Sequence, residues 1–97
     1  MIIALDYDGT YTEDPDLWNK FLEDSKKRGH IIYLVTMRFP EEENDIIKLR
    51  IRKRVKDVIF TGRKAKKQFV SELGININIW IDDSPEWILG DSVWKKK

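Results

Sequence analysis

Two aspartates one residue apart, Asp6 and Asp8, close an apolar run that extends from residue 2 to residue 5. Carboxylates this close together repel each other unless one is protonated or a cation lies between them. A short, unbroken apolar run is typical of a strand buried on both faces of a parallel sheet, and open sheets of this kind bind ligands at the carboxyl ends of their strands. The pair therefore predicts a metal-assisted site at the end of the first strand.

Polar groups follow three further predicted strands in the same way. Thr36 follows the run 31–35, Gly62 breaks the run 58–61, and the pair Asp82-Asp83 follows the run 75–81. Because parallel strands end at one edge of a sheet, these groups are expected to converge. A carboxylate can attack a dianionic phosphate ester only when a divalent cation and fixed donors offset the charge. The converging groups therefore predict a site for phosphoryl transfer.

Each group has a predicted role in such a transfer. Asp6 would attack phosphorus and form an aspartyl-phosphate, which divides one difficult displacement into two easier steps. Asp8 would protonate the leaving oxygen and then take a proton from water. Thr36 and the backbone at Met37 would hold phosphate oxygens, and the acidic pair after the fourth strand would complete the shell of a Mg²⁺ ion.

A lysine at the start of the third predicted helix would supply a fixed positive charge. Lys66 precedes Phe69 and Val70 by three and four residues, so its stem is expected on the buried face of that helix. This spacing favours Lys66 as a catalytic and phosphate-binding residue. Lys64 and Lys67 stay open as alternatives.

The segments between the strands have helical patterns. An aspartate and a proline at 14 and 15 start a helix expected over residues 15–28, and Gly29 ends it. Pro40 and three glutamates start a second, with an apolar stripe at residues 47, 51 and 55. Residues 69, 70 and 73 give the third one buried face. Alternating strands and helices predict a Rossmann-like, three-layer α/β/α fold with a doubly wound parallel sheet.

Composition restricts the chemistry. The 97 residues support a single domain over residues 1–97. There is no cysteine and only one histidine, His30, which excludes thiolate catalysis and favours oxygen ligands and Mg²⁺. The net charge of +1 gives no global argument for a nucleic-acid or membrane partner. No stretch approaches about 18 apolar residues and no basic segment precedes the first apolar run, so a soluble, cytoplasmic protein is expected.

Four segments together resemble the haloacid dehalogenase superfamily. DYDGT, the threonine of YLVTMR, a lysine of TGRKAKKQF and the acidic pair of WIDDSP match its four motifs in their order, from residue 2 to about residue 89. The second aspartate of the first motif is typical of the phosphatases of that superfamily. The resemblance therefore implies a Mg²⁺-dependent phosphatase. It also implies that Asp6, the backbone carbonyl of Asp8 and Asp83 bind the metal, while Asp82 supports them without contacting the ion.

Neither usual insertion point has room for a cap domain, because the connections at residues 11–30 and 37–57 hold little besides one expected helix each. Uncapped relatives often act on polymers or borrow a lid from a partner subunit. A nucleotide or nucleic-acid phosphate is accordingly the leading substrate hypothesis, with a homo-oligomer as an open alternative and no membrane partner expected.

Several interpretations stay open on the sequence alone. Arg38 is either a substrate contact or a surface ion pair. The basic residues between 48 and 67 form either a solvated face or a track for a nucleic-acid backbone. Trp94 and the three lysines after it suggest a last edge strand with a tail. The rival functions are a receiver-like phosphoacceptor domain, against which the order of the motifs argues, and a non-catalytic accessory protein that binds through its basic helices.

Overall fold

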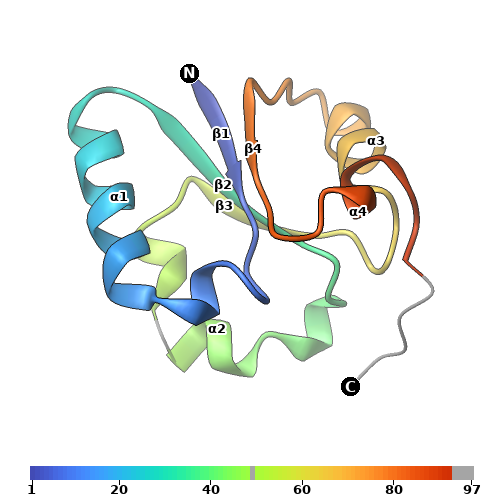
Figure 1. Cartoon of the computed structure of the whole chain (residues 1–97), viewed down its shortest axis with the longest axis horizontal. Helices are drawn as coiled ribbons and strands as arrows, with labels where there is room; N and C mark the ends of the chain where they lie inside the picture. Colours follow the sequence, from blue (N-terminus) through green and yellow to red (C-terminus); the bar gives the residue numbers. More distant parts are fainter. Residues whose placement is uncertain (49, 93–97) are drawn as a thin grey trace.

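A computed structural model describes residues 1–48 and 50–92 as an α/β domain built on a four-stranded parallel sheet, with the strand order β3-β2-β1-β4 (Figure 1). The strands are β1 (Ile2–Leu5), β2 (Ile31–Thr36), β3 (Asp57–Phe60) and β4 (Ile79–Ile81). The helices are α1 (Pro15–Lys27), α2 (Asn44–Lys48), α3 (Lys66–Glu72) and α4 (Glu86–Leu89). All three strand pairs are parallel, as the alternation of strand and helix patterns predicts.

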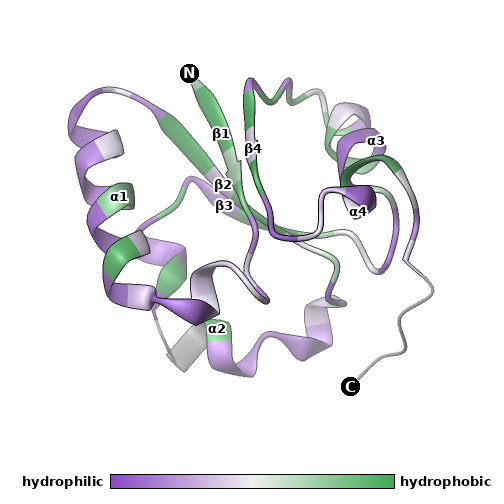
Figure 2. Ribbon diagram, in the orientation of Figure 1, coloured by the Kyte–Doolittle hydropathy of each residue, from purple (hydrophilic) through white to green (hydrophobic). Residues whose placement is uncertain are grey.

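Helices cover both faces of the sheet. Figure 1 shows α1 and α2 on one side and α3 and α4 on the other, and Figure 2 shows hydrophobic residues concentrated in β1 and β2 between them. Successive side chains of a strand point to opposite faces. Ile3 and Leu5 of β1 therefore join one core with Leu22 of α1, whereas Ala4 joins a second core with Val70 of α3. The three-layer, Rossmann-like arrangement is confirmed.

The first helix forms where its capping residues predict. The Asp14 carboxylate accepts a hydrogen bond from the amide of Leu17 at 3.2 Å, and Pro15 occupies the first turn. Gly29 ends the helix in the left-handed region, with φ +83°. The observed span ends at Lys27, one residue before the predicted end at 28.

The second predicted helix is wrong as a continuous element. Residues 40–55 instead contain two short 3₁₀ helices, Pro40–Glu42 and Ile51–Lys53, on either side of α2. The Arg38 guanidinium donates a hydrogen bond to the carbonyl oxygen of Glu42 at 2.8 Å. In a continuous helix the same oxygen would accept a hydrogen bond from the backbone amide four residues later. Arg50 then takes a left-handed conformation, φ 54°, directly before the second 3₁₀ helix, so α2 and that helix are not continuous.

The fourth predicted strand is wrong in its length, because only residues 79–81 of the expected 75–81 pair with β1. The side chain of Asn78 accepts a hydrogen bond from the amide of Ile2, and its backbone amide donates to the carbonyl of Ile2, both at 2.8 Å. The ladder therefore starts after Asn78. Ile75 and Ile77 pack against the core on the α3 side of the sheet.

The third predicted helix is present as α3, which starts at Lys66, but its buried face is narrower than expected. Val70 is buried and Phe69 half-buried, whereas Leu73 is 55% exposed. The edge strand suggested at Trp94 lies outside the described residues. Among the described helices, none has the length and apolar character that crossing a membrane requires.

Candidate active site

Three carboxylates converge at the carboxyl edge of the sheet. Asp6 follows β1, and Asp82 and Asp83 follow β4, whose Ile81 pairs in register with Leu5. The amide of Asp6 donates to the carbonyl of Ile81 at 2.9 Å, which extends the ladder to the acidic residues. One oxygen from each carboxylate lies within 4.8 Å of the others. The convergence predicted for these residues is confirmed, and the cluster could hold a metal ion.

A buried lysine completes this cluster. The Lys66 ammonium lies 2.7 Å from Asp6 Oδ1 and 2.5 Å from Asp82 Oδ2, and its side chain is 2% exposed. Lys64 and Lys67 are exposed, so Lys66 is the lysine that helix α3 turns toward the site. A charge this deep is stable only when opposite charges surround it, and two carboxylates do so here.

Burial raises the pKa of Asp6 to about 7, because desolvation and a hydrogen bond with Asp83 outweigh the attraction of Lys66. The same hydrogen bond lowers the pKa of Asp83 below its usual value. The two carboxylates therefore behave as a pair that shares one proton near neutral pH when no cation neutralises them. A divalent cation would replace that proton.

The Thr10 side chain links Asp6 and Asp83 by hydrogen bonds, a role that the sequence analysis missed. Its hydroxyl lies 3.1 Å from Asp6 Oδ2 and 3.1 Å from Asp83 Oδ1, so its single proton is shared between them. The same oxygen accepts a hydrogen bond from the amide of Asp83 at 3.2 Å. The signal available in the sequence was the position of Thr10, four residues after Asp6 in DYDGT.

Gly9 gives Asp83 the space that it occupies. A Cβ at this residue would lie 2.4 Å from Asp83 Oδ2, and the φ of +83° is itself unfavourable for alanine. We expect Gly9→Ala to displace Asp83 and to weaken binding of a divalent cation by the cluster about tenfold. The measurement is the rise in Tm on titration with Mg²⁺.

Gly29→Ala is the matched control for Gly9→Ala. Gly29 has the same φ of +83°, but nothing lies within 4 Å of a Cβ added there. Both variants carry the same backbone strain, so both are expected to lose some Tm without metal. Equal Mg²⁺ titrations for the two variants would show that Asp83 does not contribute to metal binding.

Asp8 does not join the acidic cluster in this structure. Its two oxygens are bound by the Arg38 guanidinium, from Nε to Oδ2 and from Nη2 to Oδ1, each at 2.7 Å. Arg38 is therefore observed in an ion pair, the second of the two interpretations open for it, and its side chain is only 14% exposed. The hydrogen bond with Asp8 raises the pKa of Arg38 above its ordinary value.

Arg38 is held in turn by residues that no sequence pattern singled out. Its Nη1 lies 2.7 Å from Asp45 Oδ1, and its guanidinium carbon lies 5.0 Å from the centre of the Tyr7 ring. The Tyr7 hydroxyl donates to Asp45 Oδ2 at 2.9 Å. Burial raises the pKa of Tyr7, and the bond to Asp45 adds to that effect. These contacts make Arg38 a fixed clamp on Asp8.

Thr36 and Met37 lie at the end of β2, both buried, but no hydrogen bond joins either to the acidic cluster within the described part of the chain. The Thr36 hydroxyl accepts a hydrogen bond from the amide of Arg38 at 3.2 Å, which shapes the turn. The carbonyl of Met37 accepts from the Arg63 guanidinium at 2.6 Å. Their predicted contact with phosphate stays a prediction.

The fold and this cluster define a class of site, a carboxylate and lysine centre at the carboxyl edge of a Rossmann-like parallel sheet. Comparisons with protein-family models, with curated proteins and with solved structures found no match for this chain.

Proposed function

We propose that this chain is a Mg²⁺-dependent phosphatase of the haloacid dehalogenase type, which hydrolyses phosphate monoesters through an aspartyl-phosphate on Asp6. The observation that carries the proposal is the position of Asp6 between the buried Lys66 ammonium at 2.7 Å and the carboxylates that could hold a cation. A carboxylate attacks a phosphate dianion only in such a setting, with positive charge on both sides.

The residues present fit a divalent cation, because the donors are carboxylate oxygens and the Asp6-Asp83 pair otherwise keeps a proton. Asp6, Asp83 and the backbone carbonyl of Asp8 are the proposed ligands. Asp82 supports them indirectly, since Lys66 binds its Oδ2 and the amide of Ser84 binds its Oδ1 at 2.9 Å. A bound Mg²⁺ would neutralise negative charge on the phosphoryl oxygens.

In the first step, an Asp6 oxygen forms a bond to phosphorus as the bond between phosphorus and the leaving oxygen breaks, and Asp8 gives that oxygen a proton. In the second step, water attacks the phosphorus of the aspartyl-phosphate and gives a proton to Asp8, which releases inorganic phosphate and Asp6. Lys66 stabilises the charge on the phosphoryl group throughout. Thr36 and the amide of Met37 are the proposed donors to its remaining oxygens.

Asp8 can perform these proton transfers only if a hydrogen bond to Arg38 opens, because the guanidinium occupies both of its oxygens. Arg38 itself stays in place during this step, since Asp45 and the carbonyl of Glu42 hold its Nη1 at 2.7 and 2.8 Å. In the observed arrangement Asp8 is ion-paired with Arg38, so in the proposed mechanism Asp8 takes up a proton when this hydrogen bond opens, before it acts as the acid of the first step.

For the substrate we propose a nucleotide or a phosphorylated nucleic-acid end. The connections beside the site support this choice, because within the described residues they contain no lid. They contain α1, α2 and three short 3₁₀ helices, which are Tyr11–Glu13 and the two at Pro40–Glu42 and Ile51–Lys53. A site without a lid admits the end of a polymer as readily as a small molecule.

The test is release of phosphate from 4-nitrophenyl phosphate by the purified protein, with and without Mg²⁺. We expect release with Mg²⁺, loss of release with excess EDTA, and recovery when Mg²⁺ is restored. Release that continues in EDTA would contradict the proposed mechanism. No release from this ester, from nucleotides or from 3′- or 5′-phosphorylated oligonucleotides would favour a non-catalytic accessory protein.

A further inference from the structure

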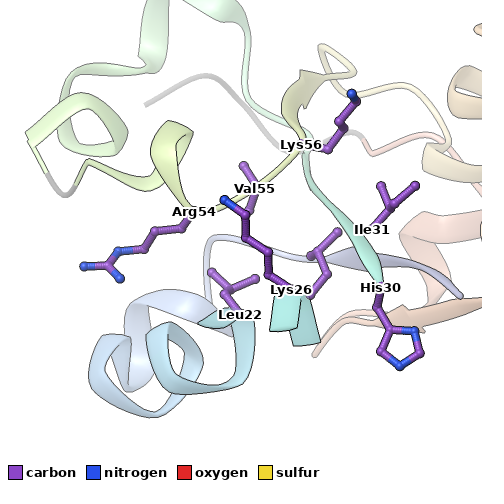
Figure 3. A pocket seen from close by; sticks show the side chains of 8 residues that line it. Leu22, Lys26, His30, Ile31, Arg54, Val55 and Lys56 are labelled. Carbon is purple, nitrogen blue, oxygen red and sulfur yellow. The ribbon is translucent and has the colours of Figure 1, made fainter. Parts of the chain in front are cut away.

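A cavity lies at the edge of the sheet opposite the acidic cluster, where β2 and β3 begin. It has a volume of about 300 Å³ and lies between the second half of α1, the start of β2 and the turn at residues 54–56 that leads into β3 (Figure 3). The residues that line it are Leu22, Lys26, His30, Ile31, Ile32, Arg54, Val55 and Lys56. None of them belongs to the acidic cluster, so this cavity is separate from the proposed active site.

Backbone hydrogen bonds hold the walls of this cavity together. The amide of Lys56 donates to the carbonyl of Ile32 at 2.7 Å, which ties the turn to β2. The amide of His30 donates to the carbonyl of Ser25 at 3.0 Å, which ties β2 to the end of α1. The cavity is therefore formed before any ligand arrives, which lowers the entropic cost of binding.

The floor of the cavity is apolar. Leu22 and Ile32 are buried at 1% and 5% exposure, and Val55 packs against the same core. Ile31 continues this apolar surface toward solvent, because it is 41% exposed. A ligand that fits here would bury an apolar body against these aliphatic side chains.

Every ionisable side chain that lines the cavity is basic: Lys26, His30, Arg54 and Lys56. Figure 3 shows Lys26 extending toward Val55, while Arg54 and Lys56 extend outward on either side. Within residues 1–48 and 50–92, no ion pair involves Lys26, Arg54 or Lys56. Three basic side chains that line one cavity, with no ion pair to any of them among the described residues, favour an anion there.

We propose that this cavity binds a small organic anion, with its apolar body on Leu22, Ile32 and Val55 and its charged group between Lys26 and Arg54. Arg54 and Lys56 have long, exposed side chains that can turn inward at little cost, and a guanidinium can bind a phosphate, sulfonate or carboxylate with two hydrogen bonds. Because the volume is small, the ligand is of monocyclic or bicyclic size.

The probe is naphthalene-2-sulfonate, titrated into the ¹⁵N-labelled protein and followed by amide chemical shifts. Saturable shifts are expected at Lys26, Ile32, Val55 and Lys56. Naphthalene-2-sulfonamide, which has the same ring without the charge, and inorganic sulfate, which has charge without the ring, are expected to bind at least about tenfold more weakly. Equal binding of either analogue, or shifts centred on Asp6 and Asp83, would overturn the proposal.

Two variants locate the binding. The double variant Lys26→Gln, Arg54→Gln is expected to weaken binding of the sulfonate at least about tenfold, since both changes remove exposed cations and keep only part of the apolar stems. Lys20→Gln, another exposed lysine of α1, is the matched control and is expected to bind normally. Unchanged affinity in the double variant would refute the site. Because Asp6→Asn is expected to bind the probe normally, this result is independent of the phosphatase proposal.

Discussion

Asp6→Asn is expected to lower phosphate release by at least about a thousandfold. The amide has nearly the volume of the carboxylate, but it is a far weaker nucleophile and a far weaker metal ligand. Lys66 keeps Asp82 as a partner at 2.5 Å in the variant, so the fold is expected to survive. The measurement is initial rate in the presence of saturating Mg²⁺.

The same variant has a readout that does not depend on turnover. The pKa of Asp6 is raised from 3.8 to about 7, so the carboxyl contributes stability that is fully present below pH 4 and is lost as the pH rises through 7. Asparagine does not ionise. Without metal, the Tm of Asp6→Asn relative to that of the unmodified protein is therefore expected to be higher at pH 8 than at pH 5.

Asp24→Asn controls for a general effect of removing an acidic residue, because Asp24 is exposed on α1. It is expected to leave both the rate and the pH dependence of Tm unchanged. If Asp6→Asn retained more than a tenth of the activity, Asp6 would not be the nucleophile. If its pH dependence of Tm matched that of the unmodified protein, the carboxyl would not be buried against Asp83 in solution.

Lys66→Met is expected to have the second largest effect, on stability as well as on activity. The Asp6 and Asp82 side chains are 8% and 2% exposed, and the variant leaves both without their cation. Removing one partner of a buried ion pair costs about 3 kcal/mol or more, which urea unfolding without metal would measure. Phosphate release is expected to fall about a hundredfold or more, because the transferred charge loses a fixed donor.

Mg²⁺ distinguishes the two consequences of Lys66→Met. The ion neutralises the carboxylates that the variant leaves unpaired, so the metal is expected to raise the Tm of this variant more than that of the unmodified protein. Activity is not expected to recover, since the ion does not replace the ammonium beside the phosphoryl group. Lys67→Met, on the exposed face of the same helix, is the matched control. Similar losses in both variants would assign the effect to α3 rather than to the Lys66 ammonium.

The choice of Lys66 shows what local spacing can determine. Its distance of three and four residues from Phe69 and Val70 specifies a face of the helix, and helical geometry then places the lysine against the sheet. The convergence of Asp6 with Asp82 and Asp83 was predictable for a similar reason. In a parallel sheet the strand ends share an edge, so no knowledge of individual contacts was required.

The clamp on Asp8 could not be predicted in this way. It depends on Asp45 and Tyr7 meeting Arg38 from separate segments, and although Tyr7 lies within DYDGT, nothing in the sequence pairs either residue with Arg38. The break in the second helix has the same origin. The pattern of residues 40–55 is helical, but the Arg38 guanidinium takes the Glu42 carbonyl, which is a contact made only in the folded chain.

By itself, the sequence determined the order of strands and helices, the three-layer parallel architecture and the carboxylates and lysine that meet at one edge, because these follow from periodicity, capping and the geometry of parallel strands. Only the tertiary structure decided which oxygen each donor reaches. It placed Thr10 between Asp6 and Asp83, turned Asp8 to Arg38, and arranged Lys26, Arg54 and Lys56 around an apolar floor at the far edge. Those partners are chosen by packing, and packing depends on the register of segments that are distant in the chain.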